Sequence, residues 1–142
     1  MRRILYASLL LAVVASCKKK NEDINTNTPS KEQLVGAYRQ SGETETVNGT
    51  TINTWNSTFY DACEMDNTTT LNADNTVVLT DTGVPCTPPD GGSSTWAVNG
   101  NVLTIAGIPA TIVSFDGTTL VTQATTTFNG TTSTTTTTMV KQ

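Results

Sequence analysis

The chain has 142 residues, a formal net charge of −4 and no histidine. Charged residues make up only 14% of it, below the roughly 25% of ordinary globular proteins. The lack of histidine removes the commonest general base, the commonest metal ligand, and the Ser-His and Cys-His nucleophile pairs. The length suits a single domain with a modest core. We therefore expect a protein that is not an enzyme, with no catalytic residues, no metal and no other cofactor.

The first residues have the pattern of an export signal. Arg2 and Arg3 precede an uncharged, mostly apolar run over residues 4–15, and small residues stand just before Cys17. This order is typical of a secretory signal peptide, and the run is shorter than the roughly 20 residues that span a bilayer. The residues Val14-Ala15-Ser16-Cys17 resemble a bacterial lipobox, in which the cysteine is acylated and the chain is cut before it.

The lipobox predicts a lipoprotein signal peptide over residues 1–16 and a lipid on Cys17. The protein would then sit in the cell envelope, anchored to the outer membrane on its periplasmic side or at the cell surface. The alternative is a plain signal peptide that contains a cysteine by chance. Residues 17–30 have few apolar side chains and no periodicity, so we expect a lipidated tether there, followed by one domain over residues 31–142.

The expected domain is acidic. From Lys31 onward, ten acidic residues stand against three basic ones. Such a balance gives no electrostatic footprint for nucleic acid, and an anionic lipid surface would repel the domain. Contact with the membrane is therefore expected through the lipid anchor, and we expect a monomer.

Threonine is abundant, with 31 residues, and β-branched side chains favour strands. Asn48-Gly49, Asn99-Gly100, Asp116-Gly117 and Asn129-Gly130 are strong hairpin signals, and Asp74-Asn75 is a weaker one. The expected strands are 36–47, 51–60, 66–71, 76–81, 94–98, 101–106, 109–114, 118–127 and 131–140.

Alternation assigns faces to several of these strands. Trp96 and Val98 share a face, as do Leu103 and Ile105, whereas Phe115 is expected on the face opposite Ile112. Before the strands, Ser30 and Gln33 form a capping-box pattern that predicts one helical turn. The fold class is therefore all-β: an up-and-down antiparallel meander of about eight or nine strands, closing into a barrel with a short N-terminal helical turn.

The chain contains three cysteines, Cys17, Cys63 and Cys86. If Cys17 is acylated, Cys63 and Cys86 remain as an even pair in an oxidising compartment, where a disulfide is expected. Its loop would contribute roughly 3 kcal/mol on the chain-entropy model. The alternative, a reactive thiol, lacks a nearby base or cationic partner.

The order of several motifs resembles the small lipocalin-like lipoproteins of Bacteroidetes. The motifs are Leu34–Tyr38, Cys63–Asp66, Thr70–Thr76, Cys86, Thr95–Val98 and Asn101–Ile105. Tyr38 stands where that family usually has tryptophan, and Asn75 where it usually has glycine. The resemblance implies a calyx-shaped lipocalin-like barrel and, by analogy of fold alone, a small-molecule binder.

Five aromatic residues are candidates for contact with a ligand: Tyr38, Trp55, Phe59, Trp96 and Phe115. Each could equally belong to the core. Asp61, Glu64 and Asp66 lie close together and could hold calcium, but acidic loop residues are usually solvated and no EF-hand pattern is present. We expect no metal there.

Two functions from different classes remain. The first is a tethered, non-catalytic module that holds a small apolar or amphipathic ligand. The second is a structural or interaction module with a filled barrel, whose loops, Pro85–Ser94 especially, contact another envelope component. Residues 131–138 are threonine apart from Ser133, so the interior beside them should be semi-polar and narrow, which disfavours a long fatty chain.

Overall fold

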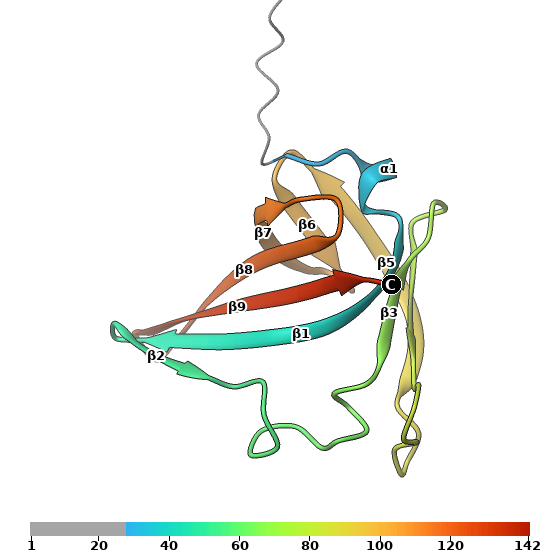
Figure 1. Cartoon of the computed structure of the whole chain (residues 1–142). Coiled ribbons are helices and arrows are strands. Elements are labelled where there is room, and N and C mark those ends of the chain that lie inside the picture. The colour runs from blue at the N-terminus through green and yellow to red at the C-terminus, as the bar shows by residue number, and fades with distance from the viewer. Residues whose placement is uncertain (1–27) are drawn as a thin grey trace, which may run out of the picture.

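The computed structural model describes residues 28–142, which form an antiparallel β-barrel with one short helix (Figure 1). The elements are α1 (Lys31–Leu34), β1 (Gly36–Val47), β2 (Thr50–Asn53), β3 (Thr68–Leu71), β4 (Thr76–Thr80), β5 (Gly91–Asn99), β6 (Val102–Ile105), β7 (Ile108–Phe115), β8 (Thr119–Phe128) and β9 (Thr131–Lys141). Every strand except β2 takes part in the ring, which closes where β9 pairs with β1. The predicted all-β meander and barrel are confirmed.

The hairpins form at the predicted turn dipeptides. Asn129 and Gly130, between β8 and β9, have φ values of 48° and 77°. Positive φ at both central residues is the geometry of a type I′ turn, whose twist matches that of the flanking strands. Asn48 and Gly49 have the same geometry between β1 and β2, whereas Gly100 and Asn101 connect β5 to β6, and the turn from β7 to β8 begins at Asp116 and Gly117.

The expected strand over residues 51–60 is wrong beyond Asn53. The Asn53 side chain accepts a hydrogen bond from the backbone N–H of Trp55, and the Asn56 side chain accepts one from that of Thr58. Such local bonds from asparagine side chains offer the backbone an alternative to a sheet ladder. The chain therefore leaves β2 early and enters a long segment, residues 54–67, which we call the β2–β3 loop.

The helix α1 seals one end of the barrel, which we call the closed end (Figure 1). The predicted capping box is present, with Ser30 and Gln33 satisfying each other's backbone N–H groups. Leu34 is fully buried, and its carbonyl accepts a hydrogen bond from the Tyr38 hydroxyl at 2.8 Å. Lys141 Nζ donates to the Gln33 carbonyl at 3.0 Å. These bonds tie a helix too short to be stable alone to the rim of the barrel.

The core lies directly beneath α1. It consists of eight buried side chains: Leu34, Tyr38, Leu71, Val77, Trp96, Leu103, Ile112 and Leu120. The largest of them, Trp96, donates its indole N–H to the Asn72 carbonyl at 2.8 Å, which satisfies the one polar group that its burial removes from water. The prediction that Trp96 and Val98 share a face is confirmed, because Val98 packs against this core.

A β-bulge in β7 puts one side chain on a different face of the sheet from the one predicted. The register between β7 and β8 shifts between Ile112 and Ser114, and the extra residue resets the alternation of side chains. Ile112 and Phe115 consequently both pack in the core, and the expectation that they lie on opposite faces is wrong.

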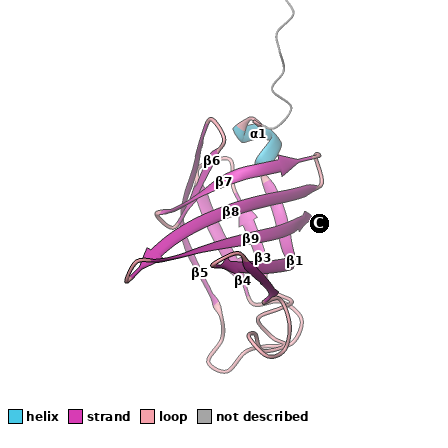
Figure 2. Cartoon of the chain, turned by 90° about the vertical axis from the view of Figure 1, so that its left-hand side faces the viewer, coloured by secondary structure: helices cyan, strands magenta, loops and turns pink. Residues whose placement is uncertain are grey.

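The threonine-rich strands extend well beyond the core. Figure 1 shows β8, β9 and β1 extending together away from α1, and Figure 2 shows β8 and β9 as long sloping strands. Phe128, at the end of β8, is 79% exposed. Pairs of threonine hydroxyls bridge neighbouring strands at 2.8 Å (Thr46–Thr51) and 3.1 Å (Thr127–Thr132). Cross-strand pairs of this kind stabilise a sheet that buries little apolar surface.

The predicted disulfide joins Cys63 in the β2–β3 loop to Cys86 in the segment 81–90, the β4–β5 loop, with the two Cα atoms 5.2 Å apart. The expected lipid site Cys17 and the expected signal peptide lie outside the described residues. Within residues 28–142, no helix is both long and apolar enough to cross a bilayer.

Candidate functional site

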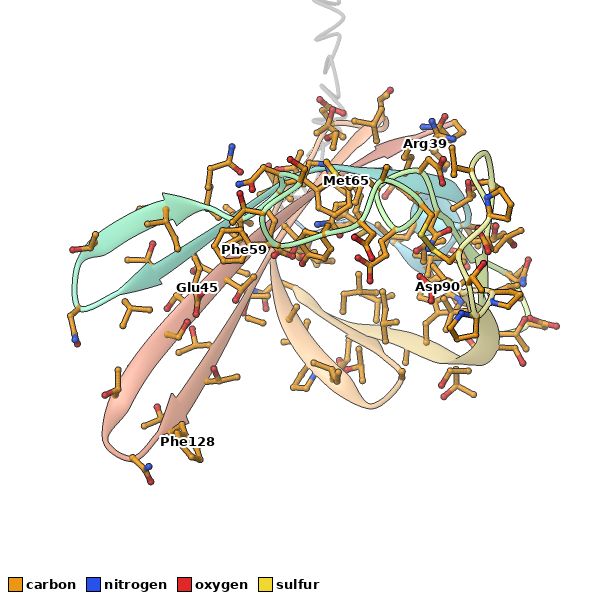
Figure 3. All side chains as sticks on the ribbon, turned by 90° about the horizontal axis from the view of Figure 1, so that it is seen from below. Arg39, Glu45, Phe59, Met65, Asp90 and Phe128 are labelled. Carbon is orange, nitrogen blue, oxygen red and sulfur yellow. A yellow bond between two sulfur atoms is a disulfide. The ribbon has the colours of Figure 1, made fainter. Side chains whose placement is uncertain are left out.

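The long loops of the fold lie at the end of the barrel opposite α1, which we call the mouth (Figure 3). It is surrounded by the β2–β3 and β4–β5 loops and by the turns that follow β1, β6 and β8. The mouth therefore gathers all the long connections of the fold, whereas the closed end has α1 and tight turns. Loops held by a rigid scaffold are where binding residues usually lie.

Two adjoining cavities occupy the barrel between the core and the mouth. One, of about 420 Å³, is lined by Gln40, Leu103, Ile105, Ala106, Ile108, Ala110, Thr122, Ala124, Thr137 and Met139. The other, of about 380 Å³, is lined by Thr69, Val77, Leu79, Gly91, Gly92, Ser93, Ser94, Ile105 and Ala106. Ile105 and Ala106 line both, so the two spaces meet at the end of β6.

The cavities exist because several inward positions near the mouth have small side chains. On β5, Trp96 fills the interior at the closed end, and Ser94 and Gly92 follow it on the same face. On β7, Ile112 is buried in the core and Ala110 follows it toward the mouth. Small inward residues on neighbouring strands leave a space that no side chain of the barrel fills.

The wall of these cavities is mainly apolar and reaches solvent. Leu79 and Ile108 line them and are nevertheless 39% and 67% exposed. Apolar side chains that face inward and remain exposed show that the space opens at the mouth. A concave, largely apolar space with a few polar groups at its edge is the usual form of a small-molecule site.

Glu43 anchors the β2–β3 loop beside this opening. Its carboxylate accepts hydrogen bonds from the Thr54 hydroxyl at 2.9 Å, the Tyr60 hydroxyl at 2.7 Å and the cavity-lining Gln40 amide at 3.2 Å. Burial and then the bond to Glu43 raise the pKa of Tyr60 to about 12. The Trp55 ring packs on that of Tyr60, with 4.8 Å between centroids.

The predicted ligand-contact residues lie elsewhere. Tyr38 and Trp96 are buried in the core, and Phe115 packs against it. Trp55 and Phe59 belong to the β2–β3 loop, where Phe59 is 54% exposed. Within the described residues, none of the five is among those that line the two cavities.

The acidic residues that suggested calcium hold the loops together. The Glu64 carboxylate accepts a hydrogen bond from the Asp61 backbone N–H at 2.6 Å, and the Asp66 carboxylate accepts one from the Val84 N–H at 2.8 Å. Asp66 also packs so closely on Gly83 that a Cβ there would clash. In the part of the chain that the structure describes, no three acidic, histidine or cysteine side chains are placed to hold a metal.

Sequence reasoning missed most of the cavity wall. Leu103 and Ile105 were paired correctly on one face, and the next inward positions, Ile108 and Ala110, follow by alternation once the β6–β7 turn is placed at Ala106 and Gly107.

Comparison with protein-family models, curated proteins and solved structures gives no significant match to this chain.

Proposed function

We propose that the protein is a membrane-anchored, non-catalytic binding protein of the bacterial cell envelope, which holds a small apolar or amphipathic molecule in its barrel. The observation that carries this proposal is the open cavity between core and mouth, whose wall includes Leu79, Ile105 and Ile108. The sequence resemblance to small lipocalin-like lipoproteins supports the same function by analogy of fold.

The point where the chain enters the barrel suits a lipid anchor on Cys17. The described residues begin next to α1, at the closed end. An anchor joined there by a short tether would attach the barrel by its closed end and leave the mouth accessible from the surrounding compartment. This orientation supports capture of a dissolved or partner-delivered molecule.

A second function, in which the barrel acts as an interaction module, is supported by exposed apolar residues outside the cavity. Val84 in the β4–β5 loop and Phe128 at the tip of the β8–β9 ribbon are 56% and 79% exposed. Such side chains can contact another envelope component. This function does not require a ligand, so the two proposals predict different results for the cavity.

Native mass spectrometry of the protein, purified gently from the envelope in its processed form, tests the two functions directly. We expect a discrete added mass that corresponds to a bound small molecule. A chain that carries only its own processing modifications would contradict the binding function and favour the interaction module.

A variant that fills the cavity sharpens this test. Ala110→Phe places a large ring on the inner face of β7, and we expect it to abolish the added mass, because the ring occupies the space of the ligand. Ala97→Phe, on the exposed face of β5, is the matched control and should retain the ligand. Equal retention by both variants would place the ligand outside the barrel.

A further inference from the structure

Charge is distributed unevenly between the two ends of the barrel. Of the ten acidic residues in the described part, seven belong to the mouth-side part of β1 or to the loops at the mouth: Glu43, Glu45, Asp61, Glu64, Asp66, Asp81 and Asp90. Lys31 and Lys141 lie at the closed end, where they donate to the Ala73 and Gln33 carbonyls. Arg39 lies on the outer face of β1, and Figure 3 places it at the periphery.

Two of these carboxylates belong to the inner surface. The register of β1 against β9 shifts between Gln40 and Gly42, so that Glu43 pairs with Thr137 and Glu45 with Thr135. Directly paired residues project from the same face of a sheet, and Thr137 lines the larger cavity. Without the bulge, Gly42 and Thr44 would follow Gln40 inward, and both acidic residues would face outward.

Of the two inner carboxylates, Glu45 has the greater remaining capacity to accept hydrogen bonds. Glu43 is occupied by donors from Thr54, Tyr60 and Gln40, whereas the one side-chain partner of Glu45 in the described structure is Ser133, which donates to it at 2.5 Å. A carboxylate has about four lone-pair sites. Glu45 therefore keeps free acceptor positions on the inner face of β1.

The loops add to the negative potential. Asp66 and Asp81 each have one buried oxygen without a hydrogen-bond partner among the described residues. No Lys or Arg belongs to the two mouth loops. Clefts lined by one sign of charge focus the field and concentrate ligands of the opposite sign. In Figure 3, which looks toward the mouth, Glu45 and Asp90 lie on opposite sides of Phe59.

We propose that the barrel selects cationic amphiphiles: molecules with an apolar body that enters the cavity and an ammonium or similar cationic head that remains at the mouth beside Glu45. This inference rests on the proposed binding function and deepens it. It gives the acidic mouth the role of a filter, which excludes fatty acids and other anionic amphiphiles from a cavity whose apolar wall would otherwise accept their tails.

Three probes with the same tail test the proposal: decyltrimethylammonium, decanol and decanoate. Each is titrated, below the concentration at which it forms micelles, into the processed protein at pH 7.5 and low salt, and binding is followed by calorimetry. We expect the ammonium to bind at least about tenfold more tightly than decanoate, with decanol between them. Added salt should narrow the difference, because mobile ions screen exposed charges.

The variant Glu45→Gln tests whether the selectivity for the cationic probe comes from the inner face of β1. Removal of one charge beside the head group should weaken binding of the ammonium and strengthen that of decanoate, so that the ratio of their affinities falls by about tenfold. Glu32→Gln is the matched control, because it removes one acidic charge from α1 at the closed end. Glu32→Gln should leave the ratio of the two affinities unchanged. Any binding of the probes to the N-terminal segment is the same in both variants, so it does not affect this comparison.

The outcomes separate this inference from the function on which it rests. If decanol binds but the two ions bind equally, or if Glu45→Gln leaves the ratio unchanged, cationic selection is refuted and the cavity remains a binding site. If decanol does not bind either, the proposed binding function fails and this inference fails with it.

Discussion

Ala106 illustrates how one residue can be held in an unfavourable conformation beside the cavity. It has a φ of 51° in the turn between β6 and β7. The other non-glycine residues with positive φ in the described structure are all asparagines, whose side chains tolerate this region, whereas alanine has no such compensation. The position costs stability and brings the Ala106 side chain into both cavities.

Ala106→Gly should therefore raise the free energy of unfolding by about 1 kcal/mol, because glycine adopts positive φ without strain. Urea denaturation followed by circular dichroism measures the change. Ala97→Gly, in the extended strand β5, is the control and should lower stability by about 0.5–1 kcal/mol. A loss of stability in both variants would contradict the strain at Ala106.

Tyr60, in the β2–β3 loop, makes the stability of the fold depend on pH at alkaline values. Its pKa is raised to about 12 from an ordinary value of 10.0, through burial and the bond to Glu43. A raised pKa in the folded state means that folding favours the protonated phenol. The stability that this group contributes is complete below pH 10 and is lost as the pH rises from about 10 to about 12.

We expect the absorbance of tyrosinate at about 295 nm to appear late in an alkaline titration, since burial also raises the pKa of Tyr38 to about 12. In Tyr60→Phe, the loss of stability between pH 10 and pH 12 should be smaller than in the unaltered protein, because one of the groups responsible is gone. An unchanged pH dependence of urea unfolding would show that Tyr60 is not buried against Glu43 in solution.

At the scale of elements, the long loops of the mouth are held by a few specific contacts. The β2–β3 loop is fixed at its start by the backbone and side chain of Glu43 in β1, and near its end by the Cys63–Cys86 disulfide. The disulfide also restrains the β4–β5 loop, where Asp81 accepts a hydrogen bond from the Cys86 N–H at 3.0 Å.

Replacement of both cysteines, Cys63→Ala together with Cys86→Ala, should lower the free energy of unfolding by about 3 kcal/mol, because the unfolded chain regains the entropy of a closed loop. Far-ultraviolet circular dichroism should stay nearly unchanged, since neither cysteine lies in a strand. Urea denaturation of the double variant beside the unaltered protein measures the loss. A loss below 1 kcal/mol would mean that the loops are ordered without the bond.

At the scale of the whole molecule, the interior has two parts with different roles. Beneath α1 the barrel is filled by large side chains, whereas toward the mouth small inward residues such as Gly92 and Ala110 leave space unfilled. A filled end can stabilise the fold while an unfilled end remains free to bind. The charge distribution follows the same axis, with lysines at the closed end and most carboxylates at the mouth.

Substitutions in the two parts should therefore differ in cost. Trp96→Ala, in the core, should lower the free energy of unfolding by about 3–5 kcal/mol, through lost burial and the cavity left behind. Ile105→Ala should cost only about 1 kcal/mol, because its side chain already faces open space on one side. Thermal and urea unfolding compare the two, and equal losses would mean that the mouth is as tightly packed as the core.

The sequence predicted most strands correctly, but it did not predict which face of the sheet several site residues occupy. Alternation placed Leu103 and Ile105 together, but it could not reveal the bulges in β1 and β7, because a bulge depends on pairing with a distant strand. Those bulges turn Glu43, Glu45 and Phe115 inward. Large aromatics suggested contact with a ligand, yet the two cavities are lined by aliphatic, small and polar side chains.

The sequence by itself determined the all-β class, most strand positions, the helical turn at Ser30–Leu34 and the Cys63–Cys86 pair, because turn residues, caps and cysteine number act locally or by simple counting. Tertiary structure alone decided which side chains face inward and that space remains above the core. These features depend on strand register and on how volumes add up around a closed ring, and both arise only when residues far apart in the chain meet.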